Sequence, residues 1–200
     1  MISTKYKRVV HLIPKDGIGG VEIAASSLSS GKYNNIEFIK YFISKPEFLI
    51  NSTDNNINGK YSNIYDFRNH INFFYWIYKK KPDLLISSIW ISHFLGSIYK
   101  LFNQKCIYVC FLHSSKPMNL FDNFFSLLAI YFSDAIFTDS VSTMEARLTK
   151  SKRLKSKIIS YILATKRSSS NFQEFDRFIY WGRYRKQKGI EDSLLLFQLI

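Results

Sequence analysis

The sequence predicts an α/β protein built on a doubly wound parallel sheet. Short apolar runs rich in β-branched and aromatic residues alternate along the chain with longer segments of helical periodicity. These runs are apolar almost throughout, as in strands that are covered on both faces. The composition, 46% hydrophobic and 17% aromatic over 200 residues, provides enough apolar side chain for a packed core. We therefore expect a parallel sheet with helices on both sides.

The elements follow one another in a regular order. The strand candidates are residues 8–13, 36–43, 83–89, 106–112, 134–139, 157–163 and 177–182. The helix candidates between them are residues 21–30, 68–80, 92–102, 120–132 and 141–150. Residues 53–63 are rich in Asn and Gly, a composition typical of an exposed loop.

Composition also predicts the domain boundaries. Residues 166–176 form a polar, serine-rich linker without periodicity, which separates a Rossmann-like domain of residues 1–165 from residues 177–200. The latter hold one strand and one helix, too little to bury a core of their own. We expect them to be the incomplete beginning of a second α/β domain.

Net charge and cysteine usage indicate which ligands and which cellular compartment to expect. The formal charge is +13, and from Lys150 onward 12 cations face 4 acids, which suits phosphate-bearing ligands, anionic lipid or nucleic acid. Cys106 and Cys110 would lie about 13 Å apart on one strand face, too far for a disulfide. No signal peptide is visible, and residues 84–99 fall short of the ~20 apolar residues of a membrane span. These features predict a cytoplasmic protein.

The last stretch of the chain has the pattern of an anion site. An aromatic and β-branched run ends at Gly182 and is followed by a basic loop that contains Arg183 and Lys188, then by Gly189 and a helical segment. Backbone N–H groups at a helix N-terminus bind phosphate, and an arginine fork can grip two phosphate oxygens. The alternative is a solvated basic loop with no ligand.

Two further features lie just after predicted strands, where doubly wound sheets bind ligands. Gly19 and Gly20 precede a helical segment of small residues, but Glu22 stands where the dinucleotide fingerprint needs its third glycine. His113 ends the run 106–112. The structural alternatives are a loop glycine pair and a packed histidine. The sequence gives weaker support for His93 as a site residue, and none for His11 or His70.

Residues 181–197 resemble the opening of the C-terminal domain in glycosyltransferase family 4, whose pattern is an apolar strand, Gly-Arg, a short loop, Lys-Gly and a helix. The resemblance implies that Arg183 and Lys188 hold the diphosphate of a nucleotide-sugar. It also implies that Gly19 and Gly20, followed by Glu22, form the loop near donor and acceptor. The chain resembles the family in order along nearly its whole length.

Three more positions match the family. They are the cleft histidine, an Asp before a strand and a Ser that begins a helix, here His113, Asp134 and Ser140. Ser114 departs from the pattern, because an acid or glycine commonly follows that histidine. The family's pair of glutamates eight positions apart is also absent, since Leu199 lies eight residues after Glu191.

The resemblance implies a retaining transferase of the two-domain GT-B type, with residues 1–165 as the acceptor-side domain. It would move a hexose or related sugar from a nucleotide-sugar to a polysaccharide, lipopolysaccharide or lipid-linked acceptor, with His113 as the catalytic candidate. The sequence contains no Asp-x-Asp motif and no zinc pattern, so we expect no metal and no cofactor, with cationic side chains stabilising the leaving diphosphate. The 200-residue chain alone is expected to be inactive.

Two other functions remain open at this point. The chain could be a basic, non-catalytic α/β module that binds anionic membrane or nucleic acid, or a truncated remnant. Nucleic acid is not the expected partner, because the aromatic residues lie in apolar runs and not among the cations. The basic clusters at 79–81 and 150–157 are solvated surface or sites for peripheral docking on the inner face of the cytoplasmic membrane.

Overall fold

The computed structural model describes residues 7–16, 21, 35–45, 56–159 and 189–198. The chain divides into two compact units, Met1–Ala164 and Thr165–Ile200. The described strands are β1 Lys7–Ile13, β2 Ile36–Phe42, β3 Asn56–Asn58, β4 Leu84–Ser88, β5 Ile107–Leu112, β6 Ala135–Thr138 and β7 Ser156–Ile158. The described helices are α2 Phe67–Lys80, α3 Trp90–Phe102, α4 Leu120–Phe132, α5 Val141–Arg147, α6 Lys150–Arg153 and α7 Ile190–Gln198.

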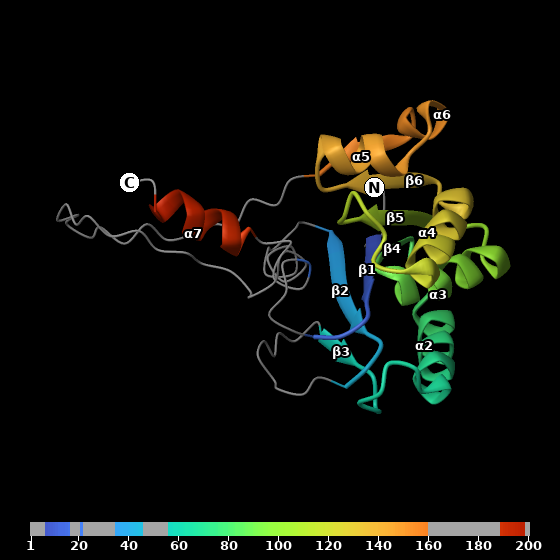
Figure 1. Cartoon of the computed structure of the whole chain (residues 1–200). Helices are drawn as coiled ribbons and strands as arrows, with labels where there is room; N and C mark the ends of the chain where they lie inside the picture. The colour runs from blue at the N-terminus through green and yellow to red at the C-terminus, as the bar shows by residue number, and fades with distance from the viewer. Residues whose placement is uncertain (1–6, 17–20, 22–34, 46–55, 160–188, 199–200) are drawn as a thin grey trace. The chain divides into compact units, whose positions relative to one another are not determined.

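The first unit is organised around one parallel sheet. Its seven strands lie in the order β3-β2-β1-β4-β5-β6-β7, and every neighbouring pair is parallel (Figure 1). Helices alternate with the strands along the chain. The predicted α/β class with a doubly wound parallel sheet is therefore confirmed.

The strand order reverses beside β1. From β1 the chain first adds β2 and β3 on one side, and then returns to add β4 to β7 on the other. In a doubly wound sheet such a reversal of strand order marks the edge at the carboxyl ends of the strands as the place for a ligand.

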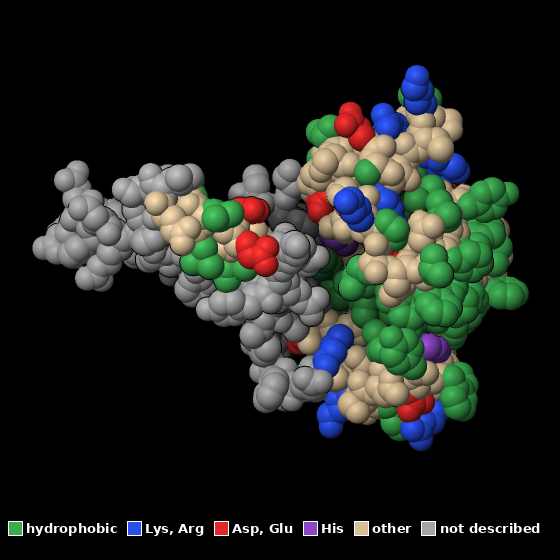
Figure 2. All heavy atoms as spheres, in the orientation of Figure 1, with side chains coloured by type: hydrophobic (Ala, Val, Ile, Leu, Met, Phe, Trp, Pro, Cys, Tyr) green, Lys and Arg blue, Asp and Glu red, His purple; other side chains and the backbone are tan. Residues whose placement is uncertain are grey.

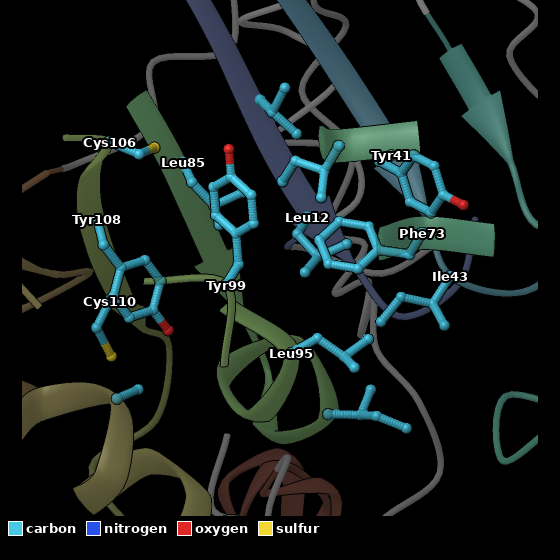
Figure 3. Packing of buried hydrophobic residues seen from close by; sticks show 14 of the residues in the cluster. Leu12, Tyr41, Ile43, Phe73, Leu85, Leu95, Tyr99, Cys106, Tyr108 and Cys110 are labelled. Carbon is cyan, nitrogen blue, oxygen red and sulfur yellow. The ribbon is translucent and has the colours of Figure 1, made fainter. Parts of the chain in front are cut away.

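The main core lies between the central strands and α2, α3 and α4. Figure 3 shows Leu85 and Tyr108 of the sheet packed with Leu95 and Tyr99 of α3, and all four side chains are almost fully buried. Because successive strand residues point to opposite faces, Ile86 lies on the other face of the sheet, in a separate cluster. The strands are thus apolar on both faces, as the continuous apolar runs predicted.

Side-chain caps define where the helices begin. The carboxylate of Asp66 accepts a hydrogen bond from the Arg68 N–H at the start of α2. Asn119 caps α4 in the same way, and the Ser140 hydroxyl caps α5 by accepting from the Thr143 N–H. Such caps satisfy N–H groups that have no partner within the helix. Ser140, matched to the family by sequence, therefore has a structural task.

The expectation that residues 53–63 form only an exposed loop was wrong. Asn56–Asn58 is strand β3, which pairs with β2 at the edge of the sheet. Gly59 follows it and is buried so closely against Ile43 that an added Cβ would lie 1.9 Å from the Ile43 carbonyl oxygen. The glycine that suggested a loop is required because two backbone segments touch there.

Both cysteines are free and buried, as expected from their spacing. Burial raises the pKa of the Cys106 thiol to about 12, and it raises the pKa of Cys110 as well. A thiol with a raised pKa holds little thiolate at neutral pH and is a poor nucleophile. We therefore assign both cysteines to packing.

In the second unit the structure describes α7. Gly189, at φ 64°, has the left-handed backbone that glycine adopts without strain, and α7 begins at the next residue. Glu191 and Asp192 lie in the first turn, where the helix dipole favours acids. The helix expected after Gly189 is thus present.

Candidate functional site

Three polar side chains meet at the carboxyl edge of the central strands. The Oγ of Ser88 lies 2.8 Å from the Nε2 of His11 and 2.9 Å from the Nε2 of His113. His11 and Ser88 are fully buried, whereas His113 is partly exposed. The group therefore runs from the interior of the sheet to its edge, and we call it the Ser88 triad.

Strand register explains why these residues meet. His11 of β1 pairs with Ile86 of β4, so Ser88, two residues further along, points to the same face. Ser88 in turn pairs with Phe111 of β5, and His113 lies two residues beyond Phe111. Parallel neighbours bring all three side chains of the triad to one face at one edge.

The hydrogen bonds of the triad favour one arrangement of protons. The Nδ1 of His11 is buried and has no partner among the described residues, so a proton there would be a buried donor without an acceptor. We therefore place the proton of His11 on Nε2, from which it donates to Ser88. The Ser88 hydroxyl then donates to the Nε2 of His113, which leaves that ring with its proton on Nδ1.

Burial keeps both imidazoles neutral. Burial, with smaller contributions from the neighbouring His113 and Lys40, lowers the pKa of His11 to about 3. Burial also lowers the pKa of His113 to about 4, an effect that the charge of Asp139 partly opposes. The ring of Phe111 contributes to that burial, since it packs 4.1 Å from the His113 ring between centroids. At neutral pH the triad is an uncharged hydrogen-bonding chain.

The backbone after Ser88 is strained. Ile89 has φ 72° and ψ 149°, a conformation that β-branched residues rarely adopt. Such a conformation costs about 1–3 kcal/mol and persists where the surrounding structure requires it, often at functional sites. The strain lies at the abrupt change from β4 to α3, which is also where Ser88 is presented.

The opposite face of the same strands carries a second polar group. The Ser87 Oγ lies 2.8 Å from the Nδ1 of His93 and 2.8 Å from the Tyr108 hydroxyl, and that hydroxyl donates to the His93 carbonyl oxygen. All three side chains are buried between the sheet and α3. This Ser87 group explains His93, which is a core residue.

Asp134 also has a structural place. Its carboxylate accepts hydrogen bonds from the Tyr108 N–H at 2.7 Å and from the Lys100 ammonium at 2.8 Å. These contacts tie the loop before β6 to β5 and α3. Asp134 and Ser140 thus fit the family pattern through roles in the fold.

The structure describes some of the predicted site residues and not others. His113 lies at the carboxyl edge of the sheet, as the end of its strand suggested. Gly19, Gly20 and Glu22 lie outside the described residues, and so do Arg183 and Lys188. Their assignments to the glycine loop and to the donor diphosphate stay predictions.

Sequence reasoning missed two residues of the triad, His11 and Ser88. Both stand in buried strands that are mainly apolar, and a polar residue in a strand that is buried on both faces needs a partner. This signal marks His11 and Ser88 as residues to explain, although it does not identify their partners. Ser88 is 77 residues from His11 in the chain.

Neither a metal site nor a membrane span is found among the described residues. Among the described residues, no group of three or more His, Cys, Asp or Glu side chains is placed to hold a metal ion. In the same part of the chain, no helix has both the length and the apolar character needed to cross a bilayer.

Comparison with known proteins relates this fold to enzymes that use nucleotide-sugars. The chain resembles the lipopolysaccharide outer core galactosyltransferase WaaB in its apo form, with a TM-score of 0.58 and 16% identity over 94% of this chain and 57% of that one. No protein-family model matches the chain, and no curated protein matches its sequence.

Two other solved structures have a similar fold. The UDP-GlcNAc 2-epimerase from Neisseria meningitidis, bound to UDP-GlcNAc, has a TM-score of 0.55 and 16% identity over 76% of this chain and 45% of that one. HepE from Anabaena, in complex with UDP, has a TM-score of 0.55 and 11% identity over 77% and 44%. The chain thus spans about half the length of these structures, and it has the fold of half of a GT-B protein.

Proposed function

We propose that this chain is part of a glycosyltransferase that transfers a sugar from a nucleotide-sugar donor. The observation that carries the proposal is the Ser88 triad, a neutral hydrogen-bonded chain that ends in the partly exposed residue His113 at the carboxyl edge of a GT-B-like sheet. The resemblance of residues 181–197 to glycosyltransferase family 4 favours transfer over epimerisation. The fold alone is similar to enzymes of both kinds.

His113 is proposed to contact the sugar as a neutral hydrogen-bonding group. Its pKa of about 4 lies about three units below neutral pH, so the imidazole is a weak base there. Three units correspond to about 4 kcal/mol less proton affinity than a base with a pKa near neutral pH would have. His113 is therefore poorly suited to remove a proton from an acceptor hydroxyl. A neutral ring held by Ser88 can instead orient a sugar hydroxyl, and small errors in such positioning are costly.

Donor binding is assigned to the residues that the family pattern indicates. Arg183 and Lys188 would bind the diphosphate, while Gly19 and Gly20 would let the backbone approach the substrates, with Glu22 beside them. Negative charge grows on the diphosphate as the glycosidic bond breaks, so the two cations would stabilise the transition state more than the bound donor. This arrangement needs no metal ion.

A polysaccharide, a lipopolysaccharide or a lipid-linked glycan is the proposed acceptor, with transfer at the inner face of the cytoplasmic membrane. The chain spans about half of the GT-B structures that it resembles. We therefore expect no turnover from residues 1–200 alone and activity only when the donor side is complete.

The proposal is tested by assaying release of the nucleotide from a panel of UDP-, GDP- and ADP-sugars. The protein is a version in which the second unit is complete, and a membrane extract supplies the acceptors. Nucleotide release that requires acceptor and yields a glycosylated product supports a transferase. Conversion of the nucleotide-sugar into its epimer without acceptor would instead make the protein an epimerase. Turnover by residues 1–200 alone would contradict the expected need for a donor side.

The same assay tests the diphosphate contacts. Arg183→Ala and Lys188→Ala should each reduce turnover about a hundredfold, because loss of one well-placed donor to developing charge costs about 3 kcal/mol. Arg185→Ala and Lys186→Ala are matched controls from the same basic loop and should change turnover little. If all four variants lose activity equally, the loop is a general basic surface and not a diphosphate site.

A further inference from the structure

Helix α4 carries several large apolar residues on the side that faces solvent. Leu120, Phe124, Leu127 and Tyr131 follow one another at helical spacing and are 86%, 60%, 54% and 71% exposed. Residues spaced by three and four positions lie on one face of a helix. The stripe is therefore continuous along the whole length of α4.

The buried side of α4 includes polar and small residues beside one large apolar one. Asp122, Ser126, Ala129 and Ile130 are buried against the rest of the first unit. A surface helix normally turns its apolar stripe inward and its polar residues outward. In α4 this distribution is partly reversed, and the fold of the unit does not account for the outward stripe.

Helix α2 extends the same surface. Phe67, Ile71 and Tyr75 are 67%, 58% and 67% exposed. Trp90 at the start of α3 lies between the two helices, with its ring 6.4 Å from the Phe121 ring of α4 and 6.0 Å from the ring of Tyr65, which precedes α2, between centroids. Figure 2 shows hydrophobic side chains gathered on the side of the first unit where α2, α3 and α4 lie. We call the outward stripes of α2 and α4 the apolar face; a patch of this kind marks a binding surface.

Helices α2, α3 and α4 carry more cations than acids, and Asp66, the cap of α2 beside Phe67, is paired with Arg68. Helices α2, α3 and α4 contain a single acid, Asp122, and it is buried. Lysines lie at the rim, with the Lys79 Nζ 5.0 Å from the centre of the Tyr75 ring and the Lys152 Nζ 5.6 Å from that of Tyr131. Apolar and aromatic groups bordered by lysines are typical of surfaces that lie in the interfacial layer of a membrane.

We propose that the apolar face rests on an anionic bilayer, with Phe124 and Leu127 entering the acyl boundary and Lys79 and Lys152 among the headgroups. Anionic lipid complements the lysine rim, whereas a second copy of this chain, with its own formal charge of +13, would bring cations against cations. The proposal makes the earlier expectation of docking through 79–81 and 150–157 more specific, because the apolar side chains carry the contact and the lysines orient it. It stands apart from the transfer reaction.

The test is flotation of the purified 200-residue chain with vesicles of phosphatidylcholine, with and without phosphatidylglycerol. The chain should float with the anionic vesicles, and less at high salt because screening weakens the lysine contribution. The double variant Phe124→Ser and Leu127→Ser should lower partitioning at least about tenfold, since each removes a large apolar group from the bilayer. Both residues are exposed in the folded protein, so the variant should unfold at the temperature of the parent.

Ile36→Ser is the matched control, a partly exposed apolar residue at the amino end of β2, and should bind like the parent chain. Lys79→Gln with Lys152→Gln should weaken binding to anionic vesicles and leave the weak binding to neutral ones unchanged. Light scattering gives the oligomeric state in parallel. Equal flotation of the double variant and the parent overturns the proposal. So does failure of the parent to bind any vesicle, or dimerisation that the double variant abolishes while vesicle binding persists.

Discussion

Adjacent serines at the end of β4 take part in two polar groups with different properties. Ser87 points toward α3 and, with His93 and Tyr108, forms a group whose three linked atoms are all hydrogen-bonded in the interior. Ser88 points to the other face and joins two histidines, of which His113 is partly exposed. One strand thus supports a closed group and an open one, separated by a single peptide unit.

The difference shows which group has a structural role and which has the features of a functional site. A buried polar group with its bonds made stabilises one arrangement of the core and leaves nothing for a ligand. The Ser88 triad instead has a buried nitrogen of His11 without a described partner, strained backbone at Ile89 and a ring at the edge of the sheet. Imperfect bonding, strain and access at one place are features of functional sites.

Acid should destabilise the protein strongly, and both groups should contribute. The folded-state pKa is lowered to about 3 for His11 and His93 and to about 4 for His113, so at pH 4–6 the unfolded chain binds up to three more protons than the folded one. The free energy of unfolding should therefore fall as pH falls through this window, by at most about 4 kcal/mol per pH unit.

Denaturant unfolding at several pH values measures this slope. His93→Gln should reduce it by about a third, and so should His113→Gln, because each removes one buried histidine that must stay neutral. An unchanged slope in either variant would show that this histidine is not held neutral in the folded protein.

Removal of the His93 imidazole should mainly lower stability, whereas removal of the His113 imidazole should mainly lower activity. His93→Ala leaves a cavity and unpaired hydrogen-bonding groups in the core, and should lower the free energy of unfolding by about 3 kcal/mol. His113→Ala, at the edge, should cost less than about 1 kcal/mol of stability but should reduce turnover of the complete enzyme about a hundredfold. Urea unfolding and steady-state assays on both variants give the comparison. A His113→Ala protein with full activity would remove His113 from the proposed site.

Substitution of the two serines should show the same separation as substitution of the histidines, with smaller effects: Ser87 should affect stability and Ser88 turnover. Ser87→Ala leaves His93 and Tyr108 without their shared partner and should cost about 1–2 kcal/mol of stability. Ser88→Ala should change kcat more than KM, because it frees the ring of His113 to take other orientations. Histidine ring signals in NMR spectra should then shift for His11 and His113 and not for His93. Identical effects of the two substitutions on stability and on turnover would contradict the assignment of separate roles.

The smallest expected effect concerns Ile89. Glycine adopts its φ of 72° without strain, whereas alanine keeps the strain and loses most of the side chain. Ile89→Gly should therefore be more stable than Ile89→Ala by about 1 kcal/mol, opposite to the usual order of these residues. Thermal unfolding of the two variants measures the difference. If alanine is the more stable, the turn after Ser88 is not strained in solution.

The sequence predicted a central strand of the sheet better than an edge strand. Residues 106–112 were predicted as a strand and Ile107–Leu112 is one, because a continuous apolar run at a sheet centre is unambiguous. Strand β3 was missed because Asn56–Asn58 has only one apolar residue, and its pairing depends on the neighbouring β2. Local pattern is decisive where burial is complete and uninformative at a sheet edge.

The amino-acid sequence by itself determined the class of fold, the order of its central elements and the position of His113 at the end of a strand, because these depend on local apolar patterning. Only the tertiary structure decided which serine meets which histidine. Strand alternation places Ser87 and Ser88 on opposite faces, but their partners are set by the register of β1, β4 and β5. Register arises from the packing of the whole sheet, and so the partnership of His11 with Ser88 could not be deduced from either run alone.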